Sequence, residues 1–305
     1  MSSGLCYNAR RLVGVLFFAW AALSFANARP EPSASLLLPD VPFHPQEDFQ
    51  CGPAALAMLL NHAGVAVTPE QLQPQVYLPA REGSLTAEML AATRRQQRIP
   101  YLVPGNLDAM LRELADGYPL LVLLNLGLSW WPRWHYAVLI GHDADRRELI
   151  LHSGRERASR MQLTPFLNSW QRGGNWAMLA SQPARLPRSA DPGWVLQQGI
   201  ALEQAGQDRV AAELYQAAVD RWPDVAELWF GLGNVAYRQA LLQKAEFAWQ
   251  QALQHKPASV PARLNLIELL LEQGRAEDAR RLVQQGLQLE PRRAEYLQLQ
   301  QRLQP

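Results

Sequence analysis

The sequence predicts two folded parts, an α+β domain followed by an all-α solenoid of helical repeats. The first prediction rests on residues 42–181, in which helical and strand patterns alternate. The second rests on a 34-residue period that begins after residue 192. A short apolar segment near the first residue belongs to neither part and has the layout of an export signal.

Composition favours a globular protein. The chain has 305 residues, 48% of them hydrophobic and 19% charged, which is enough for two modest domains and unlike a disordered or fibrous chain. The formal net charge is only +1. A basic surface of the kind that binds nucleic acid is therefore not expected.

The N-terminal segment predicts a signal peptide over residues 1–28. Arg10 and Arg11 precede an apolar run over 12–25, which ends at Ala26-Asn27-Ala28. A run of about 14 residues is shorter than the roughly 20 that a membrane-spanning helix needs. Cleavage after Ala28 would place the protein in the periplasm or outside the cell, with no stable membrane span. An uncleaved N-terminal membrane anchor remains the alternative.

The rest of the chain divides into four segments. A Pro-rich entry over 29–41 leads into the α+β domain at 42–181. Residues 182–192 contain three prolines and no apolar periodicity, so they read as a linker. Three repeats and a capping helix are expected over 193–305.

Within the first domain, the patterns predict an antiparallel sheet with helices packed on it. We expect helices at 84–97, 106–116 and 164–172, and strands at 119–127, 135–141, 148–152 and 175–180. A further helix is expected to begin at Cys51.

The C-terminal part resembles the tetratricopeptide repeat (TPR). Prolines recur every 34 residues, at Pro223, Pro257 and Pro291, and small residues recur at the same period. Repeat two fits best, whereas repeat three has Arg263 in place of Trp229. The resemblance implies a groove that binds a peptide or a protein partner. A spacer or dimerisation arm is the alternative.

Cys51 is the candidate nucleophile. It precedes Gly52 and Pro53, and Pro53 suits a first helical turn. A thiol at a helix N-terminus is expected to have a pKa below the usual ~8.5, which favours the reactive thiolate. Signal cleavage would also remove Cys6 and leave Cys51 as the sole cysteine. A buried core cysteine is the structural alternative.

The surroundings of Cys51 suit an oxyanion hole. Gly52 allows the backbone to pass close to the attacked group, and the Cys51 amide is a donor there. The side-chain amide of Gln46 or Gln50 could supply a second donor.

His135 is the candidate base because it opens an apolar run over 135–141 that reads as a strand. A strand can carry an imidazole to the opposite side of a cleft from the cysteine helix. The remaining histidines outside the motif are expected to have surface or structural roles; they include His44, His62, His142 and His255.

The run 46–60 and the histidine strand resemble the bacteriocin-processing (double-glycine leader) peptidases and their soluble relatives in the papain-like clan. The resemblance implies that Cys51 is the nucleophile, His135 the base and Gln46 the oxyanion donor. Gln46 stands five residues before the cysteine, where the family's glutamine usually stands six before it. The family's orienting aspartate is also missing.

Residues 151–154, where that aspartate would be expected, read Leu-His-Ser-Gly. Ser153 could orient His135 through a hydrogen bond, and Asp143 or Asp145 could reach in from the nearby turn. Papain-like enzymes commonly use an uncharged asparagine here, so a carboxylate is not required.

Taken together, these features predict an exported cysteine peptidase that acts on a peptide or protein, with the repeats binding substrate or a partner. The family's leader peptidases work with a membrane transporter, so their substrate is not carried over. The alternative is a catalytically inactive, papain-like peptide-binding scaffold with the repeats as an assembly module. No cofactor or metal is expected, because the scattered histidines lack zinc-ligand spacing.

Overall fold

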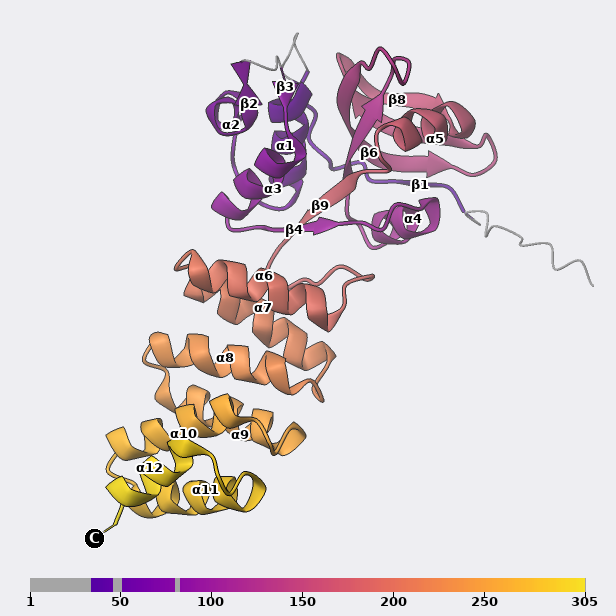
Figure 1. Cartoon of the computed structure of the whole chain (residues 1–305). Coiled ribbons are helices and arrows are strands. Elements are labelled where there is room, and N and C mark those ends of the chain that lie inside the picture. The colour runs from indigo at the N-terminus through magenta and orange to yellow at the C-terminus, as the bar shows by residue number, and fades with distance from the viewer. Residues whose placement is uncertain (1–33, 46–50, 80–82, 305) are drawn as a thin grey trace, which may run out of the picture. The chain divides into compact units, whose positions relative to one another are not determined.

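A computed structural model of the chain describes residues 34–45, 51–79 and 83–304. The described residues form an α+β domain followed by a run of helices (Figure 1), as the sequence predicts. The elements of the first domain are, in chain order, β1 (Leu36–Leu37), α1 (Cys51–His62), α2 (Pro69–Val76), β2 (Tyr77–Leu78), β3 (Gly83–Ser84), α3 (Thr86–Arg95), β4 (Ile99–Leu102), α4 (Leu107–Ala115), β5 (Leu120–Asn125), β6 (Trp134–Asp143), β7 (Glu148–Ser153), β8 (Glu156–Gln162), α5 (Leu163–Arg172) and β9 (Ala177–Ser181).

The core of this domain is a seven-stranded antiparallel sheet in the order β4-β9-β5-β6-β7-β8, with β1 paired to β6. Strand β6 is buried on both faces, because Tyr136 and Val138 join one hydrophobic cluster while Ala137 and Leu139 join the other. That double burial explains the uninterrupted apolar run after His135. The sheet and its register fix the position of that histidine.

Helices cover both faces of the sheet. Residues of α1, α2 and α3 share one hydrophobic cluster with β6, and residues of α4 and α5 share the other. Helix α1 is buried on every side from Gly52 to Leu60. A helix that is apolar all round belongs in the centre of a domain.

Three elements carry no strong sequence signal. Strand β8 is an edge strand, mostly exposed and polar, which is how proteins avoid edge-to-edge pairing. Helix α2 is short and starts with a capping box at Thr68 and Gln71. Strand β4 has only four residues. None of them shows the long apolar period on which sequence prediction depends.

The segment predicted as a linker is fastened to the α+β domain. The buried Glu113 accepts hydrogen bonds from the backbone N–H groups of Arg188 at 3.0 Å and Ser189 at 2.7 Å. Tyr101 Oη also donates to the Ser189 carbonyl at 2.8 Å. These bonds neutralise the cost of burying a carboxylate and give the connection a defined path.

The C-terminal part consists of α6 (Pro192–Gln204), α7 (Asp208–Arg221), α8 (Ala226–Arg238), α9 (Leu242–His255), α10 (Val260–Glu272), α11 (Ala276–Leu289) and α12 (Ala294–Arg302). Small residues lie where the helices cross. Gly199 and Gly231 both pack against the Tyr215 ring, and a Cβ at either glycine would overlap it. The recurring small residues therefore make room for large aromatic side chains.

Arg263 replaces the tryptophan of repeat two with little change in hydrogen bonding. Trp229 Nε1 donates to the Pro223 carbonyl at 2.6 Å, and Arg263 Nη2 donates to the Pro257 carbonyl at 2.6 Å. Both pairs are offset by 34 residues. The departure from the repeat pattern therefore keeps the contact that ties each helix to the turn before it.

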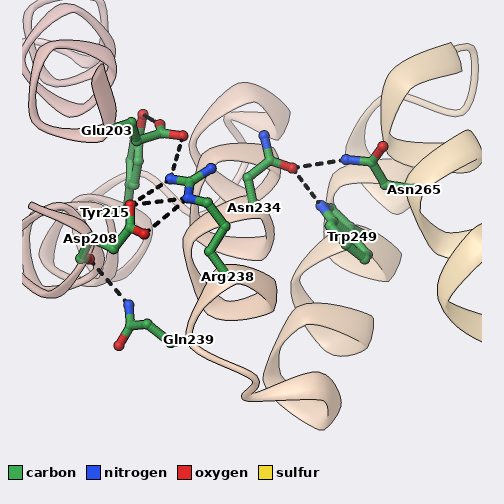
Figure 2. A network of polar contacts seen from close by, with 8 residues as sticks. All are labelled: Glu203, Asp208, Tyr215, Asn234, Arg238, Gln239, Trp249 and Asn265. Atoms are coloured by element: carbon green, nitrogen blue, oxygen red, sulfur yellow. Dashed lines mark hydrogen bonds and ion pairs between the residues drawn. The ribbon is translucent and has the colours of Figure 1, made fainter. Parts of the chain in front are cut away.

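Polar side chains join successive repeats (Figure 2). Arg238 of α8 forms ion pairs with Glu203 of α6 at 2.9 Å and Asp208 of α7 at 2.7 Å. Asn234 Oδ1 accepts hydrogen bonds from Trp249 Nε1 at 3.1 Å and Asn265 Nδ2 at 2.9 Å. Exposed pairs of this kind stabilise little individually, but they fix the register between repeats.

Within the described residues, no helix combines the length and apolar character that crossing a bilayer requires. The predicted signal peptide over 1–28 lies outside those residues.

Candidate active site

Cys51 is the first residue of α1, and its sulfur lies against β6. The thiol is partly buried, packs against the cluster of α1 and the sheet, and forms no disulfide. The Tyr136 backbone N–H donates a hydrogen bond to the sulfur, as do those of Gly52 and Cys51. The amide that approaches from the sheet belongs to the residue that follows His135.

Gly52 permits this close approach. A Cβ at residue 52 would overlap the Ser84 side chain of β3 and lie 3.8 Å from the Tyr136 ring. Tyr136 Oη in turn donates to the Ser84 carbonyl at 3.2 Å. The helix N-terminus is therefore wedged between β3 and β6, with no space for a side chain beside the cysteine.

The predicted lowering of the thiol pKa is wrong. Burial raises the pKa of Cys51, and the amides of Tyr136, Gly52 and Cys51 only partly oppose that rise. The sequence shows the helix N-terminus but not the packing around it, and desolvation of the charged thiolate outweighs the dipole here. The free protein therefore favours the neutral thiol.

His135 is the second residue of β6 and pairs with Leu124 of β5. Its Nε2 atom is 2.8 Å from Ser153 Oγ at the end of β7. Burial lowers the pKa of His135, so the ring is neutral at neutral pH. If Nε2 carries the proton and donates to Ser153, Nδ1 is the atom that can accept a proton from a thiol.

Ser153 is the predicted orienting residue that reaches the imidazole, and Asp143 is remote from it. Asp143 ends β6, eight residues after His135, which is roughly 26 Å along a strand. It instead accepts from the Arg146 N–H at 3.1 Å and pairs with Arg160 at 2.9 Å. Asp145 follows in the same turn. The catalytic roles of all these residues remain predictions.

His152, next to Ser153, is a structural residue that the sequence did not single out. Its Nδ1 accepts from the Ala158 N–H at 3.1 Å, and its Nε2 is 3.1 Å from the Val41 carbonyl. Both ring nitrogens are thus occupied, and burial lowers its pKa. His152 holds the segment around Val41 against β7 and is not one of the two candidate catalytic residues, Cys51 and His135.

The other predicted histidines lie elsewhere. His44 Nε2 is 2.8 Å from Asn61 Oδ1, and His62 Nε2 is 3.0 Å from the Gly117 carbonyl. His142 is buried on β6, seven residues beyond His135. His255 lies 3.7 Å from Asp224 in the repeats. Gln46 and Gln50, the candidate oxyanion donors, lie outside the described residues.

Two features near the site escaped the sequence argument. The Tyr136 amide is a backbone donor, which no side-chain motif reveals. Asn125, a buried polar residue that closes the apolar strand β5, shapes the loop before His135; a polar residue at the end of an apolar run was its only sequence signal. No group of three or more metal-ligating side chains occurs in the described part of the chain.

Comparison with known families gives a match to each of the two structural parts. Residues 38–178 match the Peptidase_C39 like family, and residues 196–262 and 242–303 match two tetratricopeptide repeat models. A comparison with curated proteins gave no significant match.

Solved structures give weaker similarities. A putative C39-like peptidase from Bacillus anthracis is 16% identical, with a TM-score of 0.42, over 51% of this chain and 100% of that one. A double glycine motif protease from an AMS/PCAT transporter, in complex with the leader peptide, is 20% identical, with a TM-score of 0.35, over 46% and 90%. The Arabidopsis OM64 TPR domain is 21% identical, with a TM-score of 0.33, over 36% and 91%.

The family models match the same residues that form the two structural parts. The chain therefore has a C39-like α/β domain, followed by a run of helices that matches tetratricopeptide repeats.

Proposed function

We propose that this protein is an exported cysteine peptidase in which Cys51 is the nucleophile and His135 is the general base. One observation carries the proposal. The Cys51 sulfur accepts a hydrogen bond from the Tyr136 N–H, so it lies beside the end of β6 that carries His135. The family assignment of residues 38–178 supports the same chemistry.

The proposed reaction proceeds through a thioester. The Cys51 sulfur attacks the carbonyl carbon of the peptide bond while its proton passes to His135 Nδ1. His135 then returns that proton to the amine as the carbon–nitrogen bond breaks. A water molecule, deprotonated by His135, hydrolyses the thioester, and the proton returns to the thiolate.

The oxyanion is proposed to bind the N–H of Cys51 and the side-chain amide of Gln46. The free amides at the start of α1 already point at the sulfur, and an oxyanion formed beside that sulfur would come within their reach.

The resting pair is proposed to be a neutral thiol and a neutral imidazole. Burial raises the pKa of Cys51 and lowers that of His135, and both shifts oppose an ion pair. Ser153 adds no negative charge to stabilise an imidazolium. The thiol proton would then pass to the imidazole as the sulfur attacks the carbonyl carbon and the oxyanion forms.

The repeats are proposed to bind the substrate or a protein partner, and the residues 1–28 to direct export with cleavage after Ala28. The division of the remaining chain at 42–181, 182–192 and 193–305 stays a proposal of the same kind. N-terminal sequencing of the protein recovered from the periplasm or medium tests the cleavage. A pull-down with the full chain, with and without substitutions of exposed α8 residues, tests whether the repeats bind a partner.

A non-catalytic, peptide-binding scaffold is the second candidate. The raised pKa of the Cys51 thiol and the serine in place of an orienting carboxylate favour it. Such a protein would hold a peptide beside Cys51 and His135 and would use the repeats to assemble with partners.

Alkylation and cleavage separate the two candidates. The full chain is incubated with a peptide library, and the fragments are identified by mass spectrometry in parallel with Cys51→Ala and His135→Ala. A peptidase gives fragments that both variants lose, and iodoacetamide labels Cys51 more slowly in His135→Ala. His255→Ala in the repeats is the matched histidine control. A scaffold gives no fragments, and its labelling is indifferent to His135.

A further inference from the structure

The loop between β5 and β6 displays an apolar surface next to the candidate site. We call residues 126–134 the tryptophan loop. Its large apolar side chains are exposed: Leu126, Leu128, Trp130, Trp131 and Trp134 have exposed fractions of 47%, 56%, 77%, 69% and 56%. Scattered apolar residues on a surface need no explanation, but a cluster this dense marks an interaction site.

The buried Asn125 holds the base of the loop. Its Oδ1 accepts from the N–H groups of Gly127 at 2.9 Å and Arg133 at 3.0 Å, and its Nδ2 donates to the Leu128 carbonyl at 3.4 Å. The guanidinium of Arg172 on α5 donates to the Asn125 carbonyl at 3.0 Å. A side chain that is only 2% exposed thus ties both arms of the loop together.

The tip of the loop is ordered as well. Leu128 and Trp131 exchange two backbone hydrogen bonds, at 3.1 and 3.2 Å. A Cβ on Gly127 would overlap the Trp131 carbonyl, so the turn needs glycine there. The rings of Trp130 and Trp131 meet edge to face with centroids 6.3 Å apart. The loop therefore presents its rings in a fixed arrangement, which lowers the entropic cost of binding.

The loop continues directly into the catalytic strand. Trp134 opens β6 and precedes His135, and it pairs with Asn125 across the hairpin. Because side chains alternate along a strand, Trp134 shares a face with Tyr136. Tyr136 packs in the cluster of α1, and its amide contacts the Cys51 sulfur. Trp134, the end of the loop nearest the sheet, therefore lies on the face that carries the candidate nucleophile, and the rest of the tryptophan loop extends from it.

We infer that the tryptophan loop binds apolar side chains of the substrate beside the peptide bond that is cleaved, so that the protein selects apolar peptides. This inference rests on the proposed function. Arg133 is the sole charged residue in the loop, so charge gives little attraction to an acidic partner. Uncharged rings on a loop that leads into the strand beside the nucleophile fit an extended peptide with leucine-like side chains.

Two peptidyl probes test the inference on the full chain. The fluoromethyl ketones of Ac-Leu-Leu-Gly and Ac-Ser-Ser-Gly alkylate a thiol, forming a sulfur–carbon bond as fluoride leaves. Each labelling rate is divided by the rate with iodoacetamide, which has no side chain to bind. The variants are the double substitution Trp130→Ser/Trp131→Ser and the control Leu289→Ser, whose side chain is also apolar and exposed but lies in the repeats.

The expected result is a fall of about tenfold in the leucine probe's relative rate in the double variant, while the serine probe and the control keep theirs. Equal labelling by both probes, or no change in the double variant, overturns the inference. So does a double variant whose sole loss is binding to phosphatidylglycerol–phosphatidylcholine vesicles, because the loop would then be a membrane surface. Circular dichroism checks that the variants fold.

Failure of the proposed function would look different. If Cys51 is not a nucleophile, neither ketone labels it, and iodoacetamide labels the wild type and His135→Ala alike. Calorimetric titration of Cys51→Ala with Ac-Leu-Leu-Gly-amide then tests the loop alone. Binding that the double substitution abolishes supports the inference, and absence of binding overturns it.

Discussion

His135 Nε2 and Ser153 Oγ lie 2.8 Å apart, on the neighbouring strands β6 and β7. A hydroxyl can accept a hydrogen bond from the ring N–H and hold the ring's orientation, but it carries no charge to stabilise an imidazolium. The family's carboxylate would do both. The Ser153 hydroxyl can therefore orient the imidazole without stabilising its positive charge. Substitution of Ser153 tests this role.

Ser153→Ala is expected to lower kcat about fivefold with little change in KM, because one hydrogen bond that orients the base is worth ~1 kcal/mol. Ser153→Asn restores an uncharged acceptor and is expected to keep most of the activity. Steady-state kinetics on a peptide found in the cleavage screen measures both. Equal activity in Ser153→Ala and wild type would mean that the hydrogen bond does not orient the base.

The neutral resting pair predicts a particular pH dependence. Because the pKa of Cys51 is raised and that of His135 is lowered, kcat/KM should stay level between about pH 6.5 and pH 8.5. It should fall below that range as the imidazole gains a proton, and above it as the thiol loses one. Thiolate absorbance at 240 nm, measured against Cys51→Ser, should be absent at pH 7. Strong absorbance at that pH would show an ion pair instead.

Stability of the α+β domain should also fall with acid. Burial lowers the pKa values of His135, His142 and His152 in the folded state. Below about pH 6.5 the unfolded chain binds protons at these positions that the folded chain does not. The free energy of unfolding therefore decreases as pH falls from 6.5 through the folded pKa values, and it is unaffected by these groups above 7.5. Calorimetric melting at pH 5 and pH 7.5, with NMR titration of the three rings, measures this; rings that titrate at their usual pH would contradict it.

The sequence predicted those parts of the site that rest on strong periodicity. The apolar run after His135 predicted β6, because a strand buried on both faces must be apolar throughout. Ser153 stood at the right distance along the chain to be named as an orienting residue. The raised pKa of Cys51 could not be predicted, since it depends on packing by β3 and β6, and these strands are distant in sequence.

The polar elements are the other part of the structure that the sequence did not predict. Strand β8 is exposed, so its residues lack the apolar alternation that marks a half-buried strand. The shape of the tryptophan loop depends on Asn125, whose three hydrogen bonds to the loop only the folded hairpin reveals. In both cases hydrogen bonds, and not apolar burial, set the structure, and they leave little trace in side-chain hydrophobicity.

In the repeats, the sequence pattern indicated Arg263 as a departure. In the structure, however, Arg263 of repeat three forms the same hydrogen bond as Trp229 of repeat two. Each donates to the proline carbonyl six residues earlier, at 2.6 Å. Arg263 is also 4% exposed and reaches Gln285 Oε1 at 3.2 Å. In repeats two and three the shared property of this position is thus the donor and not the ring, whereas repeat one has Val195 there.

That equivalence leads to a stability prediction. Arg263→Leu removes the donor and leaves the Pro257 carbonyl unpaired, so it should destabilise the repeats by about 1–3 kcal/mol. Arg263→Trp supplies an indole N–H at the same position and should cost less than Arg263→Leu. Urea unfolding of the full chain, followed by far-UV circular dichroism, measures both. Because leucine is apolar and fits a core, a larger loss for Arg263→Trp would show that packing, and not the hydrogen bond, governs this position.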